Sequence, residues 1–505
     1  MTPRAAGADR PLDQRRFDFR PFSSSLLPVG LALLLGLGLA LLAEVGSWRL
    51  ALVALGAAGF PLAMRVSGNP RLFLLWCMVF ALPFDLSLYL GGISDKGGGE
   101  RAWRLEVSDV FLLGLLAFQL RDLLSRRWPG WRIPKLTWLW VVVMGFAVLT
   151  VLEGPYRNAA AQELFRMLKV TALFLVVANE LRSAGRVMHM AGAVALAVLF
   201  QSVFAIIQYL HGAPFGLDIL GEIGSATTKV LSLTSVESGQ VFRVSAFLGH
   251  PNLLGIYLAA TLPLAIAAFL FRQSSPRKAF FFASAVCGAA ALVLTQSRSG
   301  WASFALAVLV LFGGLMAHGR LTRRSGAAAA IGLVALLAVG IVFQDAILTR
   351  LFDSKADAAT GRAVFLEDAE RLIDVKPWWG WGINSYVQEI PPYMKSSRKA
   401  YGGWIPPVHN IYYLWWAETG IVGLCVHLAL WLGLLAVAWR NRVVTDERLF
   451  AINLACAAGL LAFAVDGVLS FSLRVNPISR LYFLQAGIVL AIHYWRVTNP
   501  NRPAA

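Results

Sequence analysis

Arg362 has the residue type and position expected of an anion-binding group. It lies in the first turn of a predicted amphipathic helix, directly after Thr360 and Gly361. A cation in that turn opposes the helix dipole, at a cost of a few tenths to about 1 kcal/mol. The position is favourable if the helix N-terminus and the guanidinium bind the same anion. The alternative is an arginine whose stem packs on the protein while its head reaches water.

A second arginine, Arg298, is the only charge in a short hairpin between two apolar segments. The hairpin reads Thr-Gln-Ser-Arg-Ser-Gly-Trp at 295–301. Hydroxyl and amide groups, among them Gln296 and Ser297, flank the arginine, which favours a phosphate-type cradle. The alternative is an arginine that reaches from the bilayer to its interface.

His409 ends a long polar loop in the sequence Pro-Pro-Val-His-Asn-Ile at 406–411. Histidine is the usual general base near neutral pH, and the alternative is a histidine that hydrogen-bonds at a helix start. Asn410, the next residue, is a candidate supporting group. Glu418 falls about 180° away around a regular helix. We therefore expect it to make structural hydrogen bonds unless that helix breaks.

His250 precedes Pro251 and Asn252 at the start of another apolar segment. Proline presets a helix start, so a capping role is favoured over catalysis. The sequence has no His-Glu-x-x-His, no Gly-x-Ser-x-Gly and no Asp-x-Asp pair in a predicted inner loop. These absences argue against a zinc hydrolase, a serine hydrolase and a metal-dependent nucleotide-sugar transferase.

The elements that must position these residues are membrane helices. The 505 residues are 58% hydrophobic and 14% charged, with a mean hydropathy of +0.64. Soluble proteins have roughly 45–50% apolar and about 25% charged residues. The composition excludes a soluble enzyme, a disordered scaffold and a disulfide-stapled secreted module, and predicts an all-α polytopic membrane protein. The net charge of +17 then reflects cytoplasmic Lys and Arg rather than a nucleic-acid partner.

About 20 apolar residues cross a bilayer as a helix. Fourteen segments approach or reach that length, and because the second, fourth and sixth are short, we predict 12–14 transmembrane helices. The first is too long for a cleaved signal peptide. The segments are 26–45, 49–64, 71–92, 107–120, 136–153, 167–181, 188–210, 252–271, 279–295, 301–317, 326–347, 411–438, 449–472 and 479–494.

The distribution of Lys and Arg predicts the orientation. With the N-terminus inside, every inner loop has at least two basic residues, so both termini are expected in the cytoplasm. The predicted organisation is a cytoplasmic segment (1–25), N-terminal transmembrane helices (26–210), an extracytoplasmic loop (211–250), central transmembrane helices (251–347), a long extracytoplasmic loop with the catalytic elements (348–409), C-terminal transmembrane helices (410–494) and a cytoplasmic tail (495–505).

The two outer loops are longer than a turn requires, which is typical of functional loops. The second contains a predicted amphipathic helix from Arg362 to Asp374, which Pro377 ends. Its apolar residues fall on one arc at the helical period: Phe365, Leu366, Ala369, Leu372 and Ile373.

Taken in order, these motifs resemble the bacterial O-antigen ligase and O-antigen polymerase family. The resemblance covers about 245–430. The motifs are His-Pro-Asn at 250–252, Thr-Gln-Ser-Arg-Ser-Gly-Trp at 295–301, Thr-Gly-Arg at 360–362, Lys-Pro-Trp-Trp-Gly-Trp-Gly-Ile-Asn at 376–384, His-Asn-Ile-Tyr-Tyr-Leu at 409–414 and Glu-Thr-Gly at 418–420.

The resemblance implies a metal-independent glycosyltransferase on the outer face of the bacterial inner membrane, with no cofactor. The implied donor is a glycan on undecaprenyl diphosphate, and the acceptor is lipid A-core or another glycan. The family's two important arginines map to Arg298 and Arg362, and its essential histidine maps to His409. The arginines would hold the diphosphate while the histidine deprotonates the acceptor hydroxyl, with inversion at the anomeric carbon.

Ligase and polymerase share this donor and motif order. Aromatic residues between 378 and 404, interspersed with Lys395, Arg398 and Lys399, could meet the sugars and phosphates of lipid A-core. This slightly favours the ligase, and an ordinary interfacial aromatic belt is the alternative. A transporter or flippase of lipid-linked glycans is a hypothesis from another class. It would need a cationic path through the bilayer, whereas Arg298 and Arg362 are expected on the outer side.

Overall fold

The computed structural model describes 59–60, 62–90, 102–126, 130–222, 233–234, 241–271, 275–321, 326, 356–394, 405 and 407–499, with the backbone alone at 219, 233–234, 241 and 356–362. The chain divides into two compact units, Met1–Cys77 and Met78–Ala505. In the first unit, the rings of Phe60 and Phe73 contact each other, with centroids 5.3 Å apart. All the candidate site residues belong to the second unit.

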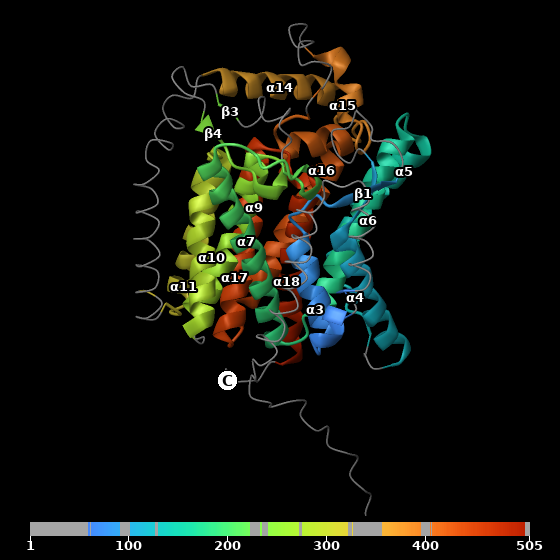
Figure 1. Cartoon of the computed structure of the whole chain (residues 1–505). Coiled ribbons are helices and arrows are strands. Elements are labelled where there is room, and N and C mark those ends of the chain that lie inside the picture. The colour runs from blue at the N-terminus through green and yellow to red at the C-terminus, as the bar shows by residue number, and fades with distance from the viewer. Residues whose placement is uncertain are drawn as a thin grey trace, which may run out of the picture. The chain divides into compact units, whose positions relative to one another are not determined.

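The architecture is all-α, and two two-stranded antiparallel hairpins accompany the helices (Figure 1). Strand β1 (Ser87–Leu90) pairs with β2 (Trp103–Glu106), and β3 (Leu233–Thr234) pairs with β4 (Val241–Phe242). The long helices are α3 (Pro70–Ala81), α4 (Val107–Leu124), α5 (Thr137–Glu153), α6 (Arg157–Glu180), α7 (Ala184–His211), α9 (Pro251–Leu270), α10 (Ser275–Leu294), α11 (Arg298–Ala317), α14 (Ala356–Val375), α16 (Ile411–Arg440), α17 (Glu447–Leu469) and α18 (Asn476–Thr498).

The prediction of a polytopic membrane protein is confirmed. Within the described residues, six helices are long and apolar enough to cross a bilayer, namely α7, α9, α10, α11, α16 and α17. The shorter helices α3 and α5 are apolar as well. The predicted span 26–45, all of 326–347 except residue 326, and most of 49–64 lie outside the described residues.

Two predicted spans differ from the helices found. The span 71–92 is wrong, because α3 ends at Ala81 and the chain continues into β1. Pro83 and Asp85 interrupt the apolar run, and a proline in a helix interior removes a hydrogen bond and clashes with the preceding turn. The span 167–181 is too short, because α6 begins at Arg157. Its first half contains the buried charges Glu163 and Arg166, which hydropathy alone does not assign to a helix interior.

Helix α9 lies at the centre of the packed helices and contacts α7, α10, α11 and α17. Alanine and leucine dominate its sequence, and nearly every residue from Leu254 to Ala268 is buried. A helix that is apolar on all sides is a core helix. The start of α9 is consequently held by neighbours on several sides.

Helix α14 lies crosswise over one end of the long helices (Figure 1). Ala369, Leu372 and Ile373 on its apolar arc are buried in a core cluster with Ile411 and Leu414 of α16. The amphipathic helix predicted for this loop is confirmed, and it ends before Pro377 as expected. Its predicted start at Arg362 is wrong, because α14 begins at Ala356. Arg362 therefore does not lie in the first helical turn, where the helix dipole acts most strongly. The short helices α15 (Tyr386–Glu389) and η3 (Pro391–Tyr393) follow it.

Candidate active site

His409 occupies a position fixed by the residue that follows it. The side-chain oxygen of Asn410 accepts hydrogen bonds from the backbone N–H groups of Tyr412 (2.9 Å) and Tyr413 (3.2 Å), which caps α16. The amide nitrogen of Asn410 donates to the backbone oxygen of Val468 in α17 (3.2 Å). An asparagine cap satisfies backbone donors that have no partner within the helix. The backbone at His409 is thereby tied to two helices.

The imidazole of His409 contacts two phenyl rings from distant segments. The ring of Phe365 in α14 stacks on it, with centroids 5.7 Å apart and an interplanar angle of 29°. The ring of Phe471 meets it edge-on, at 5.3 Å and 81°. Phe471 is the N-cap of the short helix η6 (Ser472–Arg474). The half-buried imidazole is therefore oriented by apolar contacts on two sides.

His250 caps α9. Its Nδ1 accepts a hydrogen bond from the backbone N–H of Asn252 (3.0 Å). Burial is the main cause that lowers the pKa of His250 to about 4, and electrostatic interactions with Arg243 and His409 lower it further. His250 is neutral at neutral pH and serves as a cap.

Arg243 joins the start of α9 to the turn before α11, and the sequence analysis did not single it out. Its side chain is only 6% exposed. Its Nε donates to the backbone oxygen of Thr295 (3.0 Å), and its Nη2 donates to Oδ1 of Asn252 (2.9 Å). The sequence did contain a signal for a buried arginine, because Arg243 is a lone charge between the apolar residues Phe242 and Val244.

The turn that precedes α11 presents Arg298 at the helix start. Gln296 adopts a left-handed backbone conformation (φ 51°) and is buried. Ser297 is the N-cap and accepts a hydrogen bond from the backbone N–H of Gly300 (3.2 Å). Arg298 is the first residue of α11, and its side chain is exposed. Gln296 and Ser297 thus shape the turn, while Arg298 projects from it.

Two glycines allow α9 and α11 to meet at this turn. A Cβ atom at Gly255 would lie 2.7 Å from the Cβ of Ser297, and a Cβ at Gly300 would lie 3.0 Å from the Cα of Gly255. Real Cβ atoms need more space than this, so the close approach depends on glycine at both positions. The starts of α9 and α11 consequently meet beside Arg243.

One part of the chain matches a known protein family. This part includes the turn before α11, helix α14 and His409. Residues 283–428 match the family model Wzy_C, described as O-antigen ligase. The resemblance predicted from the motifs is confirmed by this match. No curated protein matches the chain. The match supports a glycosyltransferase of the O-antigen ligase or polymerase type.

The O-antigen ligase region contains Arg298, Arg362 and His409, whereas Arg243 and His250 precede it. Arg362 lies in the second turn of α14, and its side chain is outside the described residues. Its position relative to His409 therefore stays a prediction. Phe365 follows Arg362 by one helical turn and reaches His409.

Glu418 also lies within the matched residues 283–428. Its side chain pairs with an arginine and not with His409. Its carboxylate is 2% exposed and pairs with Nη1 of Arg474 in η6 (3.0 Å). The helix does break, as α16 has a non-helical residue at Gly420, but the break follows Glu418. Glu418 therefore joins segments rather than contacting the imidazole. Among the described residues, no group of three or more His, Cys, Asp or Glu could hold a metal ion.

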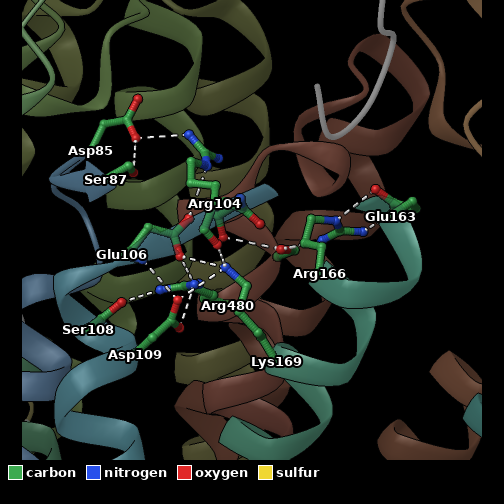
Figure 2. Close-up of polar contacts among 12 residues, drawn as sticks. Asp85, Ser87, Arg104, Glu106, Ser108, Asp109, Glu163, Arg166, Lys169 and Arg480 are labelled. Carbon is green, nitrogen blue, oxygen red and sulfur yellow. Dashed lines mark hydrogen bonds and ion pairs between the residues drawn. The ribbon is translucent and has the colours of Figure 1, made fainter. Parts of the chain in front are cut away.

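A second polar centre, which the sequence analysis did not predict, joins the helices outside the O-antigen ligase region. Figure 2 shows Arg480 of α18 beside Ser108, Glu106 and Asp109, with Lys169 of α6 on the same carboxylates. The distance from Arg480 Nη2 to Asp109 Oδ1 is 2.8 Å, and Lys169 Nζ lies 3.1 Å from Asp109 Oδ2. Each buried cation has a carboxylate partner, which buried charges require. These ion pairs join α4, α6 and α18.

Proposed function

We propose that this chain is a metal-independent, inverting glycosyltransferase of the bacterial inner membrane. It moves a glycan from undecaprenyl diphosphate to a hydroxyl of lipid A-core, as an O-antigen ligase does. The reaction takes place on the periplasmic side, and both termini are cytoplasmic. The O-antigen ligase match of residues 283–428 supports the reaction class. The six apolar helices support the membrane location.

The observation that carries the proposal is the meeting of the starts of α9 and α11 at Arg243. Arg243 binds both Asn252 at the start of α9 and Thr295 before α11. His250 caps α9 and precedes Asn252, the residue that Arg243 binds. Helix N-termini carry partial positive charge and free N–H groups, which favour anions. An exposed arginine, Arg298, begins one of these helices. This arrangement suits a diphosphate.

In the proposed reaction, the neutral imidazole of His409 accepts the proton of the acceptor hydroxyl. The acceptor oxygen attacks the anomeric carbon from the face opposite the diphosphate. A carbon–oxygen bond forms, and the bond from the anomeric carbon to the diphosphate oxygen breaks. Undecaprenyl diphosphate leaves with the bonding electrons. Arg298 and Arg362 offset the charge that develops on this leaving group.

A transporter of lipid-linked glycans would be expected to offer unpaired cations along the bilayer interior. Four cations in the described helices and η6, each with a side chain at most 10% exposed, instead contact carboxylates. They are Arg166, Lys169, Arg474 and Arg480. Their pairing favours a structural role and supports the enzyme over the transporter.

The test uses the purified full chain in lipid nanodiscs with a defined undecaprenyl-diphosphate glycan, lipid A-core and a chelator. We expect glycosylated lipid A-core by mass spectrometry, with no added metal. A product in which the lipid-linked glycan itself grows longer would instead identify a polymerase. Movement of a labelled lipid-linked glycan across liposomes without any new glycosidic bond would identify a flippase.

A further inference from the structure

The loop at 376–384 runs along the first turns of α16 and bonds to its backbone. The backbone N–H of Trp381 donates to the oxygen of Ala417, and that of Gly382 donates to the oxygen of Glu418, both at 2.9 Å. The N–H of Ile421 donates to the oxygen of Pro377 (2.9 Å). Gly420 (φ 66°) produces the kink that frees these groups, and a Cβ there would collide with the oxygen of Trp378. The loop is therefore bound at a break in the helix.

The carboxylate of Glu418 adds side-chain contacts to this backbone docking. Backbone N–H groups of Asn384 and Tyr386 donate to it. Its Oε2 pairs with Nη1 of Arg474 at 3.0 Å, and both side chains are at most 7% exposed. Hydrogen bonds to an ionised group are stronger than neutral ones. One buried carboxylate thus joins α16, the end of the loop and η6.

Glu418 contacts two segments, η6 and the end of the loop at 376–384. Each of them is connected to one of the two phenyl rings that contact His409. On one side, Arg474 ends η6, and Phe471 at the other end of η6 meets the imidazole edge-on. On the other side, Tyr386 belongs to the same buried cluster as Ala369 and Leu372 of α14, and Phe365 of α14 packs against that cluster. The Phe365 ring stacks on the imidazole.

Arg474 is buried and has a second carboxylate neighbour. Its Nη1 also lies 3.5 Å from Glu163 of α6. A cavity of about 50 Å³ borders Arg474, Glu163 and Thr419, which leaves the arginine room to move. Removing the charge of Glu418 would leave a buried guanidinium with one weaker partner, and an uncompensated buried charge is strongly destabilising.

We propose that Glu418 and Arg474 act as a positioning pair for His409, by fixing the two segments that carry Phe365 and Phe471. The pair contacts no substrate and transfers no proton. This inference rests on the proposed function, because the orientation of the imidazole affects the reaction only if His409 is the general base. A purely structural role for the pair is the alternative that the experiment must separate.

The first measurement does not depend on activity. Hydrogen–deuterium exchange of the full chain in nanodiscs is compared for wild type, Glu418→Gln, Arg474→Met and the double variant. We expect faster exchange at 380–387 and at 407–412 in both single variants. The matched control is Glu180→Gln, which also removes a buried carboxylate paired with an arginine, Arg186. Glu180 ends α6, about 25 Å along that helix from Glu163, so its loss should leave both segments unchanged.

The second measurement separates positioning from stability. In the glycan-transfer assay, kcat of Glu418→Gln and of Arg474→Met should fall by about 10- to 100-fold, because small misplacements of a reacting group are costly. KM for the donor should stay within about twofold, and the double variant should resemble the worse single variant, as expected for coupled residues. Glu180→Gln should lose thermal stability while keeping wild-type kcat.

Two results would overturn the inference. The first is unchanged exchange at 407–412 in Glu418→Gln, and the second is a kcat as high as that of the Glu180→Gln control. A wild-type chain that transfers no glycan would overturn the proposed function instead. The exchange data would then still decide whether Glu418 and Arg474 fix the segment around His409.

Discussion

The imidazole of His409 meets the ring of Phe471 edge-on, with centroids 5.3 Å apart and planes inclined by 81°. Phe365 stacks on the same imidazole. One phenylalanine comes from α14 and the other from the segment after α17, so the orientation of the histidine depends on how these elements pack. Edge-on aromatic pairs add to the free energy of area burial, by about 0.5–1.5 kcal/mol.

Replacing His409 with alanine should abolish glycan transfer without unfolding the chain. Removal of a general base lowers the rate by about 10²- to 10⁴-fold. Asn410 still caps α16, so the melting temperature should change little. His318→Ala is the control, because His318 is an exposed residue that follows α11. Transfer by His409→Ala at the rate of the control would contradict the assignment.

Replacing Arg243 with methionine should destabilise the turn before α11. The variant loses charged hydrogen bonds to Thr295 and Asn252, and each hydrogen bond to a charged group contributes about 1.5–3 kcal/mol. We expect a lower melting temperature and a higher KM for the donor, since Arg298 follows the turn. Arg442→Met, at an exposed arginine after α16, is the control. Equal melting temperatures for the two variants would show that Arg243 does not hold the turn.

Replacing Gly255 with alanine should force α9 and α11 apart. The new Cβ would lie 2.7 Å from that of Ser297, and overpacking in a core costs about 1–3 kcal/mol. Gly313→Ala is a matched control in α11, because a Cβ there meets nothing within 4 Å. Thermal unfolding in detergent should show a loss for Gly255→Ala and none for Gly313→Ala. The prediction fails if both variants unfold at the same temperature.

Replacing Arg480 with methionine should leave Asp109 and Glu106 with one cation fewer in a buried site. Breaking a buried ion pair by removing one partner costs about 3–5 kcal/mol. The full chain should unfold at a markedly lower temperature, with less folded protein after purification. Arg121→Met serves as the control, because the Arg121 side chain is 60% exposed. A comparable melting temperature would mean that the charges contribute little net stability.

Acidification should destabilise the protein partly through His250. Its folded-state pKa is lowered to about 4, whereas an unperturbed histidine has a pKa of 6.5. Between these values the unfolded state binds more protons, so this contribution to stability is complete above pH 6.5 and is lost as the pH falls towards 4. His250→Asn keeps a capping side chain and should weaken the pH dependence of the melting temperature in this range. An identical pH dependence in both proteins would contradict the assignment.

Most local elements of this protein could be predicted from its amino-acid sequence. Apolar runs of bilayer length became α7, α9, α10 and α11, because a chain in lipid must satisfy its own backbone hydrogen bonds. The helical period of apolar residues at 365–373 predicted the buried face of α14. His250 and Asn410 precede their helices as caps, which depends on neighbouring residues alone. Local motifs were also sufficient to indicate the O-antigen ligase region.

The pairing of residues that are distant in the chain could not be predicted, because it depends on how the helices pack. Arg480 and Asp109 are 371 positions apart in the chain, yet their side chains are 2.8 Å apart. Arg243 binds the backbone oxygen of Thr295, and Glu418 pairs with Arg474. Neither partner could be identified from the sequence. A charged residue can pair with any opposite charge that the fold brings near, and its sequence position does not say which. The helix packing made that choice, because a buried charge is stable only with a partner.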